Sequence, residues 1–191
     1  MNETEFSAFI FKLKKELPEF VKSLKVKDKP GKYKLSPSGD IFKNEHWGLA
    51  NSTFATRILF ILDAIEEERN DLINYILSFR QKDGFFFDSE IKKNNFFGRV
   101  KTAIRTLNLK YLSNELNERA ETRQALAALI NLGYEIEPPQ ELDFNQKGII
   151  NYFRSQNWGN VWGASSHINH LLFFIKYSDL SEEKKLRISK L

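Results

Sequence analysis

The fold is decided by the stretch Trp158-Gly-Asn-Val-Trp-Gly-Ala-Ser-Ser-His-Ile-Asn-His-Leu-Leu-Phe-Phe-Ile175, in which a turn with two tryptophans leads into a mostly apolar run. A segment that is apolar around most of its surface predicts a buried helix. The polar exceptions are Ser165, Ser166, His167, Asn169 and His170. The remaining histidine stands in His46-Trp47-Gly48, ahead of another apolar run. All three histidines are therefore predicted at helix entrances beside tryptophans.

Helical spacing of apolar residues continues through most of the chain. We predict helices over residues 6–24, 49–65, 70–83, 97–112, 121–132, 146–156, 162–177 and 180–191. Pro18 is expected to bend or restart the first helix, and Gly133 to cap the fifth at its C-terminal end. Phe85–Phe87 is the one run that resembles a strand, and it is too short. The predicted fold class is all-α.

The 191 residues are predicted to form one compact unit. In it, residues 1–43 supply an amphipathic helix and an irregular connection, and residues 44–191 supply a domain of helical hairpins. The chain has no cysteine, which excludes disulfides and thiolate metal sites. With no signal-peptide layout and no apolar run of transmembrane length, we expect a cytoplasmic protein. Residues 1–34 hold nine lysines and five acids, which accounts for the whole net charge of +4, so nucleic-acid binding across the body is not expected.

Two segments of the chain repeat one pattern. Each has a Thr-Arg pair on one helix and an Ile-Asn-Tyr-x-x-Ser string on the next, followed by Gln, Gly and an aromatic residue. The matched positions are Thr56-Arg57, 73–78, Gln81, Gly84 and Phe86 in the first segment, and Thr122-Arg123, 150–155, Gln156, Gly159 and Trp162 in the second. Gly permits the left-handed turn that ends a helix, and Gln can bond unpaired carbonyls there. The pattern predicts repeated helical hairpins.

These repeats resemble those of the α/α-toroid superfamily of terpenoid cyclases and protein prenyltransferases, which end in Gln, Gly and Trp or Phe. The resemblance covers roughly residues 44–177. It implies an α/α-toroid-like array, open or incomplete, whose inner helices start near His46, Phe97, Glu121 and Trp162 and line a central cavity. The chain has neither the Asp-rich motif of the cyclases nor the Cys zinc ligand of the prenyltransferases. The resemblance therefore leaves the activity open.

The candidates for lining this cavity are the tryptophans and polar residues at the predicted helix entrances: His46, Trp47, Trp158, Trp162, His167, Asn169 and His170. Flat aromatic walls combined with hydrogen-bonding groups suit an isoprenoid or carbohydrate ligand. The alternative is that the tryptophans fill the core and the histidines are satisfied polar groups. The three histidines are expected to converge, which would also allow a zinc site. Their spacing is common and no acidic partner is fixed, so no metal is predicted.

Arg57 and Arg123 occupy matched positions of the repeat in otherwise apolar helices. A buried arginine must be paired. Pairing with acids such as Glu66 or Glu121 is the favoured interpretation. In the alternative, the two arginines face the cavity and hold an anion, and both therefore count among the ligand-cavity candidates.

The predicted function is the binding of a small or chain-like ligand in the Trp/His-lined cavity, with catalysis undecided. Asp83 and Asp88 fit turn chemistry better than an acid–base pair. The competing prediction is a non-catalytic helical-repeat scaffold that binds another protein, and exposed Phe residues along an open groove would favour it. A homo-oligomer is also allowed. The weakest alternative is a nucleic-acid binder that uses residues 1–34 as a basic arm.

Overall fold

The computed structural model describes residues 2–39, 47–89, 96–106, 115–137, 139, 145–156, 158–188 and 190. In these ranges the regular secondary structure is helical, and strand-like pairing is limited to isolated bridges such as Arg80 with Phe86. The all-α prediction is confirmed for this part of the chain. None of the helices described here has the length and apolar character needed to cross a lipid bilayer.

The helices follow the predicted order. They are α1 (Glu3–Ser23), α2 (Gly48–Ile61), the short 3₁₀ helix η1 (Glu66–Glu68), α3 (Arg69–Leu77), α5 (Phe96–Thr106), α6 (Glu115–Asn131), α7 (Gln146–Arg154), α8 (Val161–Tyr177) and α9 (Glu182–Ile188). α2 ends earlier than predicted because Asp63 takes a left-handed conformation, with φ of 57°. α3 also ends earlier, at Leu77, and Gly84, with φ of 88°, serves a later turn. Gly133, with φ of 73°, follows α6 as predicted.

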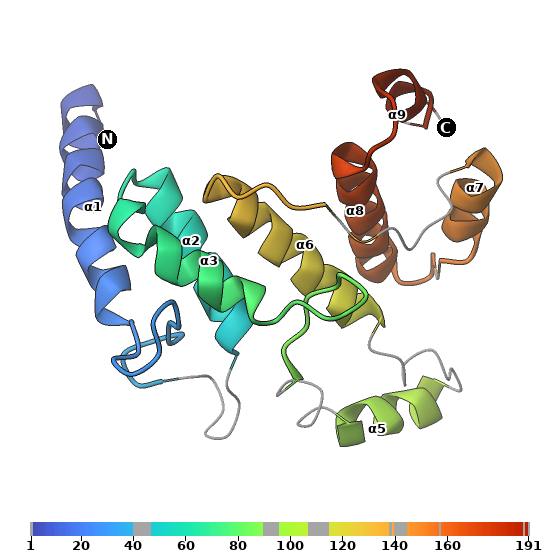
Figure 1. Ribbon diagram of the computed structural model, residues 1–191, viewed down its shortest axis with the longest axis horizontal. Coiled ribbons are helices and arrows are strands. Elements are labelled where there is room, and N and C mark those ends of the chain that lie inside the picture. The colour runs from blue at the N-terminus through green and yellow to red at the C-terminus, as the bar shows by residue number, and fades with distance from the viewer. Residues whose placement is uncertain are drawn as a thin grey trace.

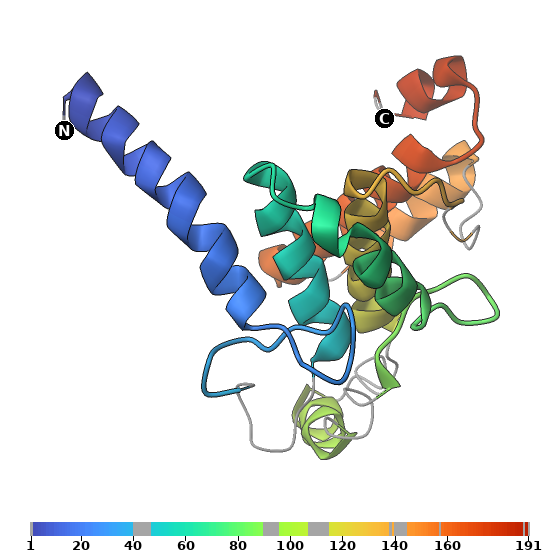
Figure 2. The same ribbon diagram turned by 60° about the vertical axis from the view of Figure 1, so that its left-hand side comes forward.

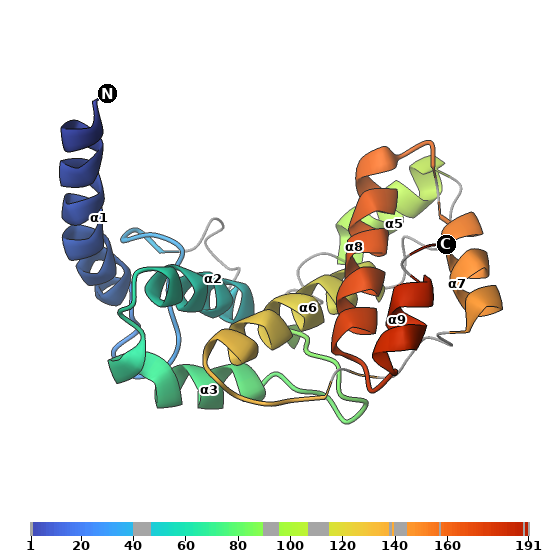
Figure 3. The same ribbon diagram turned by 90° about the horizontal axis from the view of Figure 1, so that it is seen from above.

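α2, α6 and α8 form a row across the molecule, in which α6 packs against α2 on one side and α8 on the other (Figures 1 and 3). α3 packs against both α2 and α6. The main core lies between these helices and includes Leu49, Leu59, Leu72, Ile76, Phe86, Leu126 and Leu129. A smaller cluster joins α7 and α8 through Ile149, Leu171 and Ile175. Phe85–Phe87, the run too short for a strand, is buried.

α1 diverges from this body toward its N-terminus (Figure 2). A capping box closes the N-terminal end: Asn2 Oδ1 accepts the backbone N–H of Glu5 at 2.9 Å, and the Glu5 carboxylate accepts the backbone N–H of Asn2 at 2.9 Å. The helix continues through Pro18, so the predicted restart there is wrong. Of its 21 residues, all described, only Pro18 and Val21 are buried.

The C-terminal end of α1 and the loop after it are held firmly to the body. Lys25 Nζ lies 2.7 Å from Glu68 Oε2 and 3.1 Å from Asp71 Oδ2. Gly31, with φ of 77°, passes so close to α3 that an added Cβ would lie 2.3 Å from the Asp71 carbonyl oxygen. Tyr33 is 1% exposed and belongs to the main core. Residues on both sides of the predicted boundary at 43 and 44 therefore share one core.

The two repeats match in structure as well as in sequence. Thr56 and Thr122 are fully buried, and each hydroxyl donates to the carbonyl four residues earlier, at 2.8 and 2.6 Å. Ser78 and Ser155 end α3 and α7, and their hydroxyls donate to the carbonyls of the tyrosines three residues earlier, at 2.6 and 2.8 Å. The repeat thus produces equivalent helix ends. Gly159 differs from Gly84, because its φ is not positive.

Candidate functional site

The N-terminal end of α2 is closed by a residue distant in the sequence. Asp88 Oδ2 accepts the backbone N–H groups of Gly48 at 3.1 Å and Leu49 at 3.4 Å. Asp88 in turn donates its own backbone N–H to Glu121 Oε2 at 2.8 Å. Burial raises the pKa of Glu121 to about 8, and the Asp88 and Glu118 charges add to that effect. Asp83 accepts the Phe85 N–H at 3.0 Å, which is turn chemistry as predicted.

The predicted site residues do not meet in one place. His46 lies outside the described residues, so the convergence of the three histidines stays a prediction. Trp47 immediately precedes α2 and makes no side-chain cap. Trp162 lies in the first turn of α8, and 90% of its surface is exposed. It therefore does not line an enclosed cavity. In the described part of the chain, no three His, Asp or Glu side chains group closely enough to hold a metal ion.

Trp158 and Asn169 line a shallow groove between α7 and α8, together with Phe153, Ser165, Ile168 and Leu172. The groove encloses about 330 Å³. Trp158 stacks on Phe153 at a ring-centroid separation of 6.4 Å, and its Nε1 donates to the Phe153 carbonyl at 3.0 Å. His167 and His170 do not line this groove, so Trp158 and these two histidines have separate surroundings.

His167 belongs to a polar chain that links α6, α7 and α8. Arg119 Nη1 donates to the Tyr152 hydroxyl at 2.8 Å, and that hydroxyl lies 3.1 Å from His167 Nδ1. The Arg119 guanidinium also lies over the Tyr152 ring, 5.2 Å from its centroid. Arg119 is only 5% exposed, so this chain runs through the interior.

His170, Arg123 and Arg57 extend this polar region toward α2. His170 is 1% exposed, and its Nδ1 has no hydrogen-bond partner. Arg123 Nε is also buried without a partner. The favoured pairing of the arginines with acids is wrong for the described residues, because Glu66 pairs with Arg69 and Glu121 accepts from Asp88.

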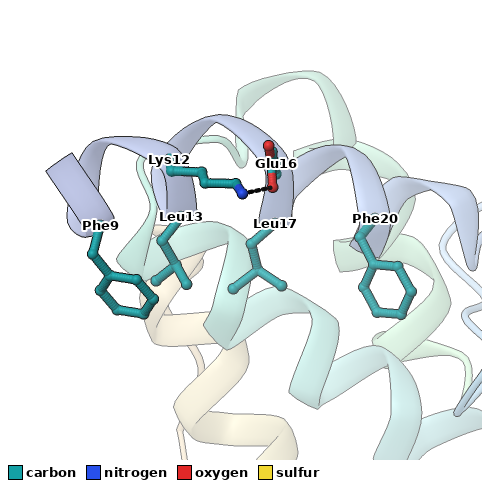
Figure 4. A pocket seen from close by; sticks show the side chains of 6 residues that line it. All are labelled: Phe9, Lys12, Leu13, Glu16, Leu17 and Phe20. Carbon is teal, nitrogen blue, oxygen red and sulfur yellow. Dashed lines mark ion pairs between the residues drawn. The ribbon is translucent and has the colours of Figure 1, made fainter.

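A different surface runs along α1. Phe9, Leu13, Leu17 and Phe20 point the same way, toward α2, and form an open groove of about 320 Å³ with Lys12 and Glu16 at its edge (Figure 4). Lys12 Nζ and Glu16 Oε2 lie 4.0 Å apart. The spacing of four and three residues between the apolar members places them on one helix face. This is an open apolar face and not an enclosed pocket.

The sequence contained a signal for this face but not for Asp88. Apolar residues at helical spacing between Phe6 and Leu24 showed that α1 is amphipathic, but not that its face stays uncovered. Asp88 was visible as a single acid after three phenylalanines, and nothing local indicated that it would reach α2. No protein-family model, curated protein or solved structure matches this chain.

Proposed function

We propose that this protein is a non-catalytic helical-repeat scaffold that binds an amphipathic helix of a partner protein along α1. The observation that carries the proposal is the open apolar face of α1. Phe9 is 51% exposed and Phe20 is 49% exposed, although both line the groove. A contiguous apolar surface of this kind marks an interaction site.

The attachment of α1 supports a role in binding. Most helices in proteins are stabilised by packing one apolar face against a neighbour. α1 packs only near its C-terminal end, where Val21 enters the core and Lys22 pairs with Glu67 at 2.8 Å. Its first turns present Phe6 and Phe9 to solvent. A partner helix on this face would supply the missing packing.

The charge beside the C-terminal end of the groove favours a partner with acidic residues. α1 itself holds four lysines and four glutamates, but residues 24–34 of the loop after it hold five lysines and one acid. Electrostatic complementarity increases the rate of association and selects among partners of similar shape. Helices recognised in apolar grooves are read through anchors at spacings of three and four residues, which matches Phe9, Leu13, Leu17 and Phe20.

The body that carries α1 is proposed to be an open α/α-toroid-like array. The row of α2, α6 and α8, with α3 and α7 following α2 and α6 in the chain, supports this arrangement. The equivalent helix ends of the two repeats support it as well. The Trp/His-lined cavity for an isoprenoid or carbohydrate ligand has less support, because Trp158 and His170 occupy separate surroundings.

Two designed peptides of about 18 residues test the proposal, since that length forms roughly five helical turns. They share one leucine face and differ only in carrying Glu or Lys on the other. Fluorescence anisotropy should show that the acidic peptide binds tighter than the basic one. Phe9→Ala should weaken binding by about tenfold or more, as expected when an aromatic anchor is removed.

Phe11→Ala is the matched control, because Phe11 is 74% exposed on α1 and does not line the groove. It should change affinity by less than about twofold, as is typical for residues outside a hot spot. Equal binding of the two peptides, or equal losses in the two variants, would contradict the proposal. Sedimentation velocity completes the test: a dimer that Phe9→Ala disrupts would place a second copy on this face instead of a partner.

A further inference from the structure

Five basic side chains gather where α2, α6 and α8 meet. They are Arg57 on α2, Arg119 and Arg123 on α6, and His167 and His170 on α8. Arg57 lowers the pKa of Arg123, and Arg123, His167 and Arg119 all lower the pKa of His170. The Arg119–Tyr152–His167 contacts join α6 and α8, and Arg123 and His170 lie one turn further along the same two helices, which places them in one cluster.

Two of its arginines lack compensating negative charge among the described residues. Within the described residues, neither Arg57 nor Arg123 forms an ion pair or a side-chain hydrogen bond. Arg123 Nε is buried without a partner, and burial is the main reason that its pKa lies below the ordinary value. An unpaired cation in a protein interior is costly, since it loses its hydration and gains nothing in exchange.

His170 also has a buried nitrogen without a hydrogen-bond partner. It is 1% exposed, its Nδ1 has no partner, and burial, followed by the nearby positive charges, lowers its pKa to about 4. The ring is therefore neutral near pH 7. A neutral imidazole with the proton on Nδ1 donates one hydrogen bond from that atom. In that tautomer, an acceptor would satisfy Nδ1 together with the two arginines.

We propose that Arg57, Arg123 and His170 form a binding site for an oxyanion group of the phosphate, sulfate or carboxylate type. Guanidinium groups bind such oxygens through paired N–H donors in a fixed fork. Arg57 and Arg123 are partly exposed, so an ion can reach the cluster from solvent. This site is distinct from the α1 face and does not depend on the proposed scaffold function.

Arg119, Tyr152 and His167 position the site without supplying free donors. The Arg119–Tyr152 and Tyr152–His167 contacts fix α7 against α6 and α8. Because His167 lies three residues before His170 on α8, fixing its ring also fixes the helix face that carries His170. The basic side chains are therefore preorganised before an anion binds.

Titration with inorganic phosphate, sulfate or acetate, each against chloride at matched ionic strength, tests the site. NMR of labelled histidine follows the pKa of His170, which Arg123 and Arg119 from α6 and His167 on α8 lower. A bound anion offsets the positive charges, so the pKa of His170 should rise by about one unit or more. The oxyanion that produces the largest rise at equal concentration identifies the preferred ligand group.

Arg123→Gln should weaken anion binding in calorimetry by about tenfold or more, the usual effect of removing a charged hydrogen-bond donor. Arg154→Gln on the exposed surface of α7 is the matched control and should leave binding unchanged. If Arg123→Gln does not fold, Arg57→Gln replaces it, since Arg57 is partly exposed. Equal losses in Arg154→Gln, or a His170 pKa that responds to no oxyanion more than to chloride, would overturn the proposal.

Discussion

The Asp88 carboxylate accepts the backbone N–H of Gly48 at 3.1 Å, although 40 residues separate the two in sequence. The first N–H groups of a helix have no partner within it and need an acceptor. Trp47, which occupies the N-cap position of α2, provides none from its side chain. The segment after α3 thus completes the N-terminal end of α2 and ties the first hairpin together.

Asp88→Ala should destabilise the fold by about 1–3 kcal/mol, because it removes the acceptor for two buried backbone donors. Asp88→Asn should cost less, since the amide oxygen can still accept. Urea unfolding measures both variants. Asp28→Ala, on the exposed loop after α1, is the control and should leave stability nearly unchanged. An Asp88→Ala variant as stable as that control would show that water replaces the cap without loss.

Glu121 makes stability depend on pH in a defined direction. Burial raises its pKa to about 8 from the ordinary value of 4.5, so the folded protein holds this proton more tightly than the unfolded chain does. The Glu121 contribution to stability is therefore full below about pH 4.5 and falls as pH rises toward 8. The slope from this single group cannot exceed about 1.4 kcal/mol per pH unit.

Glu121→Gln should remove that decline, because the amide stays neutral while its oxygen can still accept the Asp88 N–H. Unfolding free energies between pH 5 and 8 measure the effect relative to wild type. Glu118→Gln, one turn earlier on α6 and partly exposed, is the matched comparison. If Glu121→Gln and wild type lose stability in parallel over this range, Glu121 is not the buried acid responsible.

Gly31→Ala should destabilise the attachment of α1. Position 31 has φ of 77°, and an added Cβ would meet the Asp71 carbonyl oxygen at 2.3 Å and Tyr75 Cβ at 2.5 Å. Gly39→Ala is the matched control, because Gly39 has φ of 112° but no atom within 4 Å of the added Cβ. Both variants carry backbone strain of about 1 kcal/mol or more. Only Gly31→Ala adds a clash, so chemical denaturation should show a clearly larger loss for it, and equal losses would contradict the close packing.

Local sequence patterns predicted the helices well, because amphipathic spacing and the Ile-Asn-Tyr-x-x-Ser strings act over a few residues. Helix ends were less predictable. Asp63 takes a left-handed conformation that ends α2, and its residue type alone does not indicate that conformation. The candidate site was predicted only in part. The matched positions of Arg57 and Arg123 in the repeat singled them out, but their lack of acidic partners depends on how α6 packs against α2 and α8.

The open face of α1 could not be predicted for the same reason. An amphipathic pattern indicates that a helix has an apolar side, but the tertiary structure determines whether that side is covered. In α1, Val21 is buried while Phe9 remains half exposed, within one continuous helix.

Hydrogen–deuterium exchange, measured with and without the acidic amphipathic peptide, tests whether the open apolar face of α1 binds a partner helix. In the free protein, the amides of residues 6–15 should exchange far faster than those of α6, because Phe6, Phe9 and Phe11 are at least half exposed there. Bound peptide should slow the exchange of residues 6–15 by about tenfold or more and leave α6 unchanged, while the basic peptide has little effect. Two results would contradict binding on this face. One is an α1 that is already as protected as α6 in the free monomer, and the other is protection by the peptide that appears on α8 instead.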